Sequence, residues 1–107
     1  MSIAVAITDL ADTLVDYPWG YFVSVSGEPR AHLRAVPTRF VDGALLATVG
    51  EATRANIGQR PKVTMVFPPA QPGGMSLIVD GDASVRADDV VMTPTSAVLH
   101  RPALREG

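Results

Sequence analysis

The sequence predicts a small, mainly β protein. The expected fold is a barrel of five or six antiparallel strands, with one helix before the strands and a short helix between the third and fourth. Three observations lead to this prediction. Apolar and polar residues alternate with a period of two in several segments after residue 18, as in half-buried strands. Tight turn signals such as Asp42-Gly43 separate these segments by only a few positions, which favours hairpins. Up to residue 93 only two segments, 7–15 and 50–61, favour a helix, and closing the strands into a barrel leaves few unpaired edges.

Composition limits the classes of function. The chain has 107 residues, of which 47% are hydrophobic, and we expect residues 1–107 to form a single domain. Its net charge of −2 argues against nucleic acid as a partner. The absence of Cys excludes thiol nucleophiles and Cys-ligated zinc. The apolar start lacks the basic residues of a secretory signal, and no apolar run approaches the roughly 18 residues of a spanning helix, so we expect a cytoplasmic protein without a membrane partner.

The first elements follow from apolar spacing. In segment 7–15 the side chains of Ile7, Leu10 and Leu14 fall on one helical face, and Pro18 ends the run. Segment 19–26 alternates and predicts the first strand. Segment 31–36 predicts the second strand.

The middle of the chain combines strand and helix signals. Pro37 cannot donate a ladder hydrogen bond, so it predicts a sheet edge or a bulge. Segment 44–49 is nearly all apolar, which predicts a strand buried on both faces. Segment 50–61 permits a short helix that Pro61 stops, and 62–67 alternates again.

The last third predicts two more strands. Segment 75–85 is a long strand that we expect to bend at Gly81, and 90–93 is a short one. Pro94 opens a C-terminal piece, 94–103, for which one helical turn is expected.

The order and spacing of several weak motifs resemble those of a known family. The matching pieces are SGEPRAHLRAV (26–36), VDGALLATV (41–49), GEATRANI (50–57), RPKVTMVF (60–67) and SLIVDGDASV (76–85), followed by a tail, SAVLHRPA (96–103), similar to that of small actinobacterial members. Together they resemble the pyridoxamine 5'-phosphate oxidase-like flavin-binding split barrels. The resemblance implies a split barrel, a homodimer with a shared cofactor groove, and FMN or a deazaflavin coenzyme as cofactor.

A cofactor phosphate needs backbone N–H groups at a helix N-terminus and cations nearby. The stretch GEATRAN can supply the N–H groups, and Arg34 and Arg54 the cations. The candidate cofactor-binding residues are Arg34, Val36, Thr48, Val49, Gly50, Thr53, Arg54 and Asn56. No catalytic or metal-binding side chain is assigned, because a flavin carries out the redox chemistry itself.

Two functions from different classes follow from the resemblance, and a structural partner domain without a ligand is a third hypothesis. The first is an FMN- or deazaflavin-dependent oxidoreductase that acts on a small molecule. The alternative is a cofactor- or ligand-binding protein without turnover, because Thr53 stands where many family members carry Lys in the phosphate site. Outside the site, His32 and Arg39 are expected on the surface, and Trp19 and Tyr21 in the core or a dimer interface.

Overall fold

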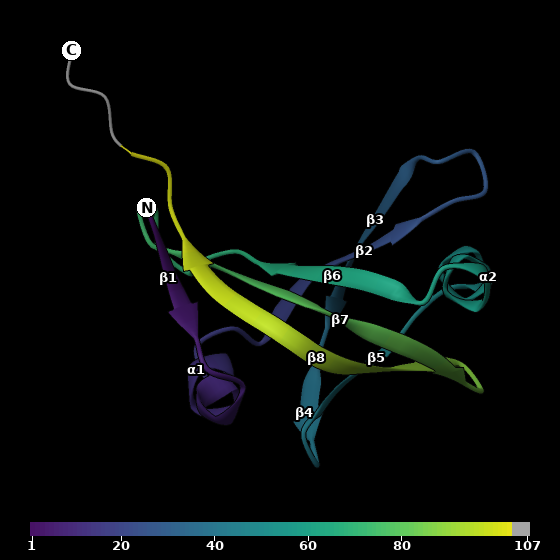
Figure 1. Ribbon diagram of the computed structural model, residues 1–107, viewed down its shortest axis with the longest axis horizontal. Coiled ribbons are helices and arrows are strands. Elements are labelled where there is room, and N and C mark those ends of the chain that lie inside the picture. Colours follow the sequence, from purple (N-terminus) through teal and green to yellow (C-terminus); the bar gives the residue numbers. More distant parts are fainter. Residues whose placement is uncertain (104–107) are drawn as a thin grey trace.

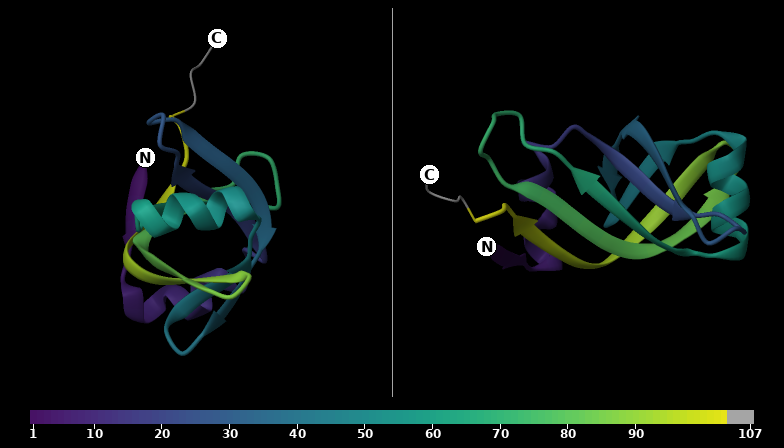
Figure 2. Two further views of the ribbon diagram at one scale, coloured as in Figure 1. Left: turned by 90° about the vertical axis from the view of Figure 1, so that its right-hand side faces the viewer. Right: turned by 90° about the horizontal axis from the view of Figure 1, so that it is seen from above.

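The computed structural model of the chain describes residues 1–103. Eight strands form one antiparallel sheet in the order β3-β2-β6-β7-β8-β5-β4, with β1 added alongside β8. The sheet curls into an open barrel, and the two α-helices lie at opposite ends of it (Figures 1 and 2). The strands are β1 (Ser2–Val5), β2 (Trp19–Val25), β3 (Ala31–Pro37), β4 (Arg39–Val41), β5 (Ala44–Thr48), β6 (Lys62–Phe67), β7 (Ser76–Arg86) and β8 (Asp89–His100), and the helices are the 3-10 helix η1 (Ile7–Asp9), α1 (Leu10–Leu14) and α2 (Glu51–Gln59).

The core lies on the concave face of the curled sheet. Alternate residues of the long strands point into it, which is what the period-two pattern requires. Leu10 and Leu14 of α1 and Ile57 of α2 are also buried. The largest fully buried apolar side chains of the sheet are Phe22, Leu45, Met65, Phe67, Leu77, Val79, Val90 and Met92.

The predicted fold class is confirmed. The protein is mainly β, and its sheet is the curled half-barrel of a split barrel, with a helix before it and a second helix between strands. The six expected strands correspond to β2, β3, β5, β6, β7 and β8. The short strands β1 and β4 raise the total to eight, above the five or six expected.

The prediction for the C-terminal piece is wrong. Instead of ending near residue 93 and turning into a helix, β8 continues through Pro94 to His100. Pro94 is tolerated because the pairing of β7 with β8 shifts register there, where Gly81 faces Pro94 and Asp80 faces Ser96. The bulge is also where the expected bend at Gly81 falls. The extra length of β8 gives β1 a strand to pair with, from Ser2 with His100 to Val5 with Ala97.

Two details of the middle strands are also corrected. The Asp42-Gly43 turn has positive φ at both residues, 51° and 81°, as a tight hairpin requires, but it joins β5 to the short β4 rather than to β3. Strand β5 is buried on one face only. Leu45 and Ala47 are buried, whereas Leu46 is half-buried and Thr48 is exposed.

The barrel stays open along one line. Strands β3 and β4 are the two edges of the sheet, so β3 bonds only to β2, and the edge position predicted for Pro37 is confirmed. Strand β5 comes close to β3 without pairing with it. Strand β4 pairs with β5 only from Ala44 to Leu46, so beyond that point β5 has no strand partner on this side. We call this unpaired line between β3 and β5 the seam. No helix within residues 1–103 has the length and apolar character needed to cross a membrane.

Candidate functional site

A groove of about 400 Å³ lies at the seam, between β3 on one side and the junction of β5 with α2 on the other. Its lining includes six of the eight predicted cofactor-binding residues, together with His32, Ala35, Glu51 and Ala52. The six are Arg34, Val36, Thr48, Val49, Gly50 and Thr53. The structure therefore brings together two sequence segments that are about a dozen residues apart, and it leaves Arg54 and Asn56 outside the lining.

The N-terminus of α2 forms one wall of this groove. Gly50 is the residue before the helix, and its backbone is extended, with φ −76° and ψ 173°. No side chain caps the helix start, so the N–H groups of Glu51, Ala52 and Thr53 keep the free donor capacity of a first helical turn. A Cβ added at Gly50 would meet nothing within 4 Å, which shows that this end of the groove is open. Uncapped N–H groups at the positive end of a helix dipole favour an anion.

Strand β3 supplies the positive charge of the opposite wall. His32 and Arg34 pair with Ser24 and Phe22 of β2, whose side chains are buried, so both lie on the inner side of the strand. The guanidinium of Arg34 donates one hydrogen bond to the carbonyl of Leu33, at 2.7 Å, and keeps further donors free. His32, which is expected on the surface, is half-buried and lines the groove, whereas Arg39, expected there too, is exposed. The signal that could have identified His32 is its i, i+2 spacing from Arg34, which puts both on one side of a strand.

Arg54 is engaged elsewhere. Its guanidinium donates a hydrogen bond to the backbone carbonyl of Val49 and lies 3.9 Å from a carboxylate oxygen of Asp88, in the turn between β7 and β8. A cation near a helix N-terminus is unfavourable for the helix dipole, and the Asp88 carboxylate offsets this. The expected pairing of Arg54 with Arg34 around an anion is therefore not the arrangement that the structure describes.

Thr53 and Asn56 differ in their relation to the groove. Thr53 lines it but is only 1% exposed, so it closes the floor of the groove. Asn56 points to the barrel interior, where its side-chain amide donates to the hydroxyl of Ser24 at 3.1 Å. Ser24 is fully buried, which makes this contact a link between α2 and β2.

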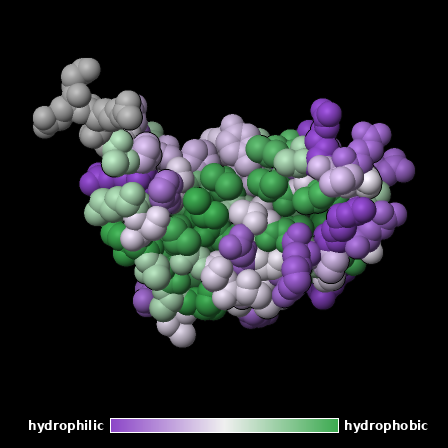
Figure 3. Space-filling view, turned by 45° about the horizontal axis from the view of Figure 1, so that its top comes forward, coloured by the Kyte–Doolittle hydropathy of each residue, from purple (hydrophilic) through white to green (hydrophobic). Residues whose placement is uncertain are grey.

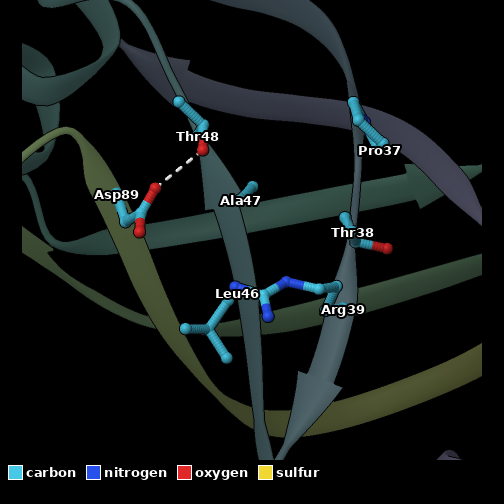
Figure 4. A pocket seen from close by; sticks show the side chains of 7 residues that line it. All are labelled: Pro37, Thr38, Arg39, Leu46, Ala47, Thr48 and Asp89. Carbon is cyan, nitrogen blue, oxygen red and sulfur yellow. Dashed lines mark hydrogen bonds between the residues drawn. The ribbon is translucent and has the colours of Figure 1, made fainter.

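A second hollow of about 200 Å³ continues along the seam (Figure 4). Thr48 lines both hollows, and its hydroxyl donates to the Asp89 carboxylate at 2.7 Å. In Figure 4 the guanidinium of Arg39 lies over Leu46, with which Arg39 pairs across β4 and β5. Pro37, Thr38 and Ala47 complete the lining. An elongated ligand held at the N-terminus of α2 could reach this second hollow, because Leu46 and Gly50 are only four residues apart, roughly 13 Å in an extended chain.

The residues of both hollows favour an organic anion over a metal ion. Within residues 1–103 there is no group of three or more His, Asp or Glu side chains placed to hold a metal. The two hollows offer instead uncapped helix N–H groups, the guanidinium groups of Arg34 and Arg39, and apolar side chains such as Val36. Such a groove can bind the phosphate of a cofactor at one end and cover a flat ring at the other.

The chain is similar to known proteins both in sequence and in fold. No protein-family model matches the chain. An uncharacterized protein of Mycobacterium bovis, Mb0449c, is 37% identical over 114 residues, covering 88% of this chain and 78% of the relative.

Three solved structures share the fold at lower identity. A candidate pyridoxamine 5'-phosphate oxidase from Listeria innocua has a TM-score of 0.71 at 17% identity, covering 87% of this chain and 96% of that one. An F420 reductase has a TM-score of 0.67 at 17% identity, with 80% and 94% covered. An FAD-binding protein from Mycobacterium smegmatis has a TM-score of 0.68 at 19% identity, with 94% and 100% covered.

The topology, the seam and these likenesses define the class of the protein. It has the split-barrel fold of the pyridoxamine 5'-phosphate oxidase-like proteins, as the sequence predicts. Within that fold class, the chain belongs to the same family as the mycobacterial protein Mb0449c.

Proposed function

We propose that the protein binds a flavin-type cofactor in the seam and acts as an oxidoreductase on a small molecule. The observation that carries the proposal is the uncapped N-terminus of α2 facing Arg34 and His32 across an unpaired seam. Both FMN and the deazaflavin coenzyme carry a phosphate that this wall can bind. The names of the structural neighbours, an F420 reductase and an FAD-binding protein, support a cofactor of this type.

The residues of the groove fit such a group. The N–H groups of Glu51 to Thr53 and the guanidinium of Arg34 would hold the phosphate, each by a charge-assisted hydrogen bond. The seam-facing backbone of β5 beyond Leu46 lacks a strand partner, so it can bond the polar edge of a ring. A bound flavin-type ring would supply the transfer of electrons or hydride, so the chain itself needs to bind, orient and shield. The second hollow, with Arg39 on its wall, is the place we assign to the small-molecule substrate.

A homodimer is part of the proposal. The convex face of β2 and β3 carries Trp19, Tyr21 and Leu33, which are 40%, 38% and 48% exposed. The rings of Trp19 and Tyr21 pack edge to face, with their centroids 5.3 Å apart. Both residues are exposed, so the expectation that they lie in the core is wrong and the dimer interface stays a prediction. Figure 3 shows apolar side chains gathered across the middle of one face of the molecule. A second copy of the chain that covered this convex face would remove the apolar surface from water and flank the seam.

The proposal also keeps the cytoplasmic location expected from the sequence, which cell fractionation would test.

One observation favours the alternative of a binding protein without turnover. Glu51 stands on the rim of the phosphate end of the groove, and Arg54 is turned to Asp88, so the positive charge at this end is smaller than the sequence indicates. Because less positive charge attracts the phosphate, the affinity for the cofactor would be weak.

The deciding experiment is a fluorescence titration of the purified protein with FMN, with the deazaflavin coenzyme and with riboflavin, which has no phosphate. We expect FMN or the deazaflavin coenzyme to bind at least tenfold more tightly than riboflavin. Arg34→Ala should lower the affinity for the phosphate-bearing cofactor by about tenfold, because one charge-assisted bond is lost, and leave riboflavin unchanged. Absence of binding by all three would overturn the proposal. Binding without oxidation of the reduced cofactor by any of a panel of small acceptors would support the binding protein.

A further inference from the structure

We propose that Arg54 and Asp88 are positioning residues that fix the phosphate-binding end of the seam, and that Arg54 is not itself a ligand of the phosphate. This inference rests on the proposed function for its consequence in binding. Its structural part can be tested without any cofactor.

The contacts converge on Val49, the residue that joins β5 to the start of α2. Its backbone N–H donates to the carbonyl of Asp88 at 3.2 Å, and its own carbonyl accepts from the guanidinium of Arg54. The same guanidinium lies 3.9 Å from the Asp88 carboxylate. We call this set, Val49 held by Arg54 and Asp88, the Val49 clamp. It engages both backbone polar groups of one residue from two elements that are far apart in the sequence.

The neighbouring residue shares the attachment. Thr48 pairs with Asp89 across β5 and β8, and its hydroxyl donates to the Asp89 carboxylate at 2.7 Å. The turn that carries Asp88 is itself held in an unusual backbone conformation, with φ of 55° at Ala87. Asp88 in the β7–β8 turn and Asp89 at the start of β8 therefore form hydrogen bonds with two successive residues, Val49 and Thr48, near the start of the helix.

The clamp matters because it fixes the backbone of Val49, whose side chain is buried in the core, directly before the helix. Gly50 follows Val49 directly, has no side chain, and has open space where a Cβ would lie. The direction of the N–H groups of Glu51 to Thr53 toward Arg34 therefore depends on where Val49 is held. In the same arrangement Nη1 of the Arg54 guanidinium contacts the Val49 carbonyl and lies near the Asp88 carboxylate, and Arg54 is not among the residues that line the groove.

The test compares Asp88→Asn and Arg54→Lys with Arg54→Ala. In the cofactor-free protein, hydrogen exchange followed by NMR should show the Val49 amide exchanging about tenfold faster in Arg54→Ala and in Asp88→Asn, since the clamp is loosened in both. The amide shifts of Glu51 to Thr53 should move in the same two variants. Arg54→Lys, which keeps a donor for the Val49 carbonyl, should lie between the parent and Arg54→Ala. Melting temperatures serve as the control that each variant is folded.

FMN titrations give the second readout. If Arg54 positions the site, Asp88→Asn should weaken FMN binding about threefold, Arg54→Ala about tenfold, and the double variant no more than Arg54→Ala alone, because both changes break one unit. If Arg54 were a phosphate ligand held back by Asp88, Asp88→Asn would leave FMN binding unchanged or tighten it, and that result would overturn the proposal. Unchanged exchange at Val49 in both variants would also overturn it. If the parent binds only the deazaflavin coenzyme, the same titrations are made with that coenzyme. If it binds neither coenzyme nor riboflavin, the proposed function falls, and the exchange and shift data alone decide whether the clamp exists.

Discussion

The side-chain amide of Asn56 in α2 donates a hydrogen bond of 3.1 Å to the hydroxyl of Ser24 in β2, and Ser24 is fully buried. This contact ties the helix that starts at the seam to the middle of the sheet. Asn56→Ala should lower the free energy of unfolding by about 1–3 kcal/mol, because a buried hydroxyl loses its partner. Urea denaturation measures this.

The double variant Ser24→Ala with Asn56→Ala provides the control. Removing both polar partners should cost less than the sum of the two single changes, because no unpaired group is left behind. FMN affinity should change by less than about threefold in Asn56→Ala, since a residue outside the groove contributes no bond to the phosphate. If Asn56→Ala lowered FMN affinity tenfold without loss of stability, Asn56 would be a cofactor-binding residue, as the sequence predicts.

Glu51 should weaken the binding of any phosphate in the groove. It lies in the first turn of α2, where its charge stabilises the helix dipole, and it lines the same wall as the free N–H groups. Glu51→Gln removes the repulsion, so we expect FMN affinity to rise about two- to fivefold, the equivalent of a few tenths to 1 kcal/mol. Riboflavin binding should not change. A fall in FMN affinity in this variant would mean that the phosphate lies elsewhere.

Tyr17 should make stability depend on pH in the alkaline range. Its hydroxyl donates to the carbonyl of Met75 at 2.7 Å, and burial, followed by the charge of Asp16, raises its pKa above the ordinary value of 10.0. A raised pKa means that the folded state favours the neutral phenol. Its contribution is thus complete below pH 10 and is lost as the pH rises through the folded-state pKa. Tyr17→Phe should lower stability by about 0.5–1.5 kcal/mol at pH 7. Thermal unfolding of parent and variant at intervals between pH 7 and 11 should show the two curves converging at the alkaline end.

Gly81 should not accept any side chain. A Cβ at this position would lie 2.4 Å from the carbonyl oxygen of Thr93 and 2.9 Å from the Met92 methyl group, at the bulge of β7 against β8. Gly81→Ala should therefore destabilise the protein by about 1–3 kcal/mol or more. Gly58→Ala is the matched control. It lies in α2 with nothing near the added methyl, and should stabilise by about 0.5–1 kcal/mol. Equal effects of the two changes in urea denaturation would contradict this account of the bulge.

The proposed dimer can be broken at one position. Leu33 is 48% exposed on the convex face of β3, so Leu33→Glu should leave the fold intact and shift light scattering from twice the 11.3 kDa chain mass to the monomer mass. Val15→Glu places the same charge at another exposed apolar position, at the end of α1, and should leave the assembly unchanged. A parent protein that is monomeric at working concentration would remove the dimer from the proposal.

Local patterns in the sequence determine most of the elements of this protein. The period of two predicts the strands, Asp42-Gly43 predicts a hairpin that the positive φ values confirm, and Pro61 marks the end of α2. These features are decided by neighbouring residues, so they can be read from a short segment. The same holds for part of the candidate site, since Gly50 to Thr53 lie at a helix start, and the resemblance adds Arg34 on a facing strand.

The closure of the sheet decided the rest. Pro94 looks like the end of a strand until Gly81 is seen opposite it, where a bulge removes the need for its missing N–H. Arg54 looks like a phosphate ligand because its charge stands at a helix start, but its partner Asp88 lies 34 positions further along the chain. Arg34 faces the groove and Arg54 contacts Asp88 because of how distant segments meet when the barrel curls. The spacing of residues within one segment does not determine such contacts.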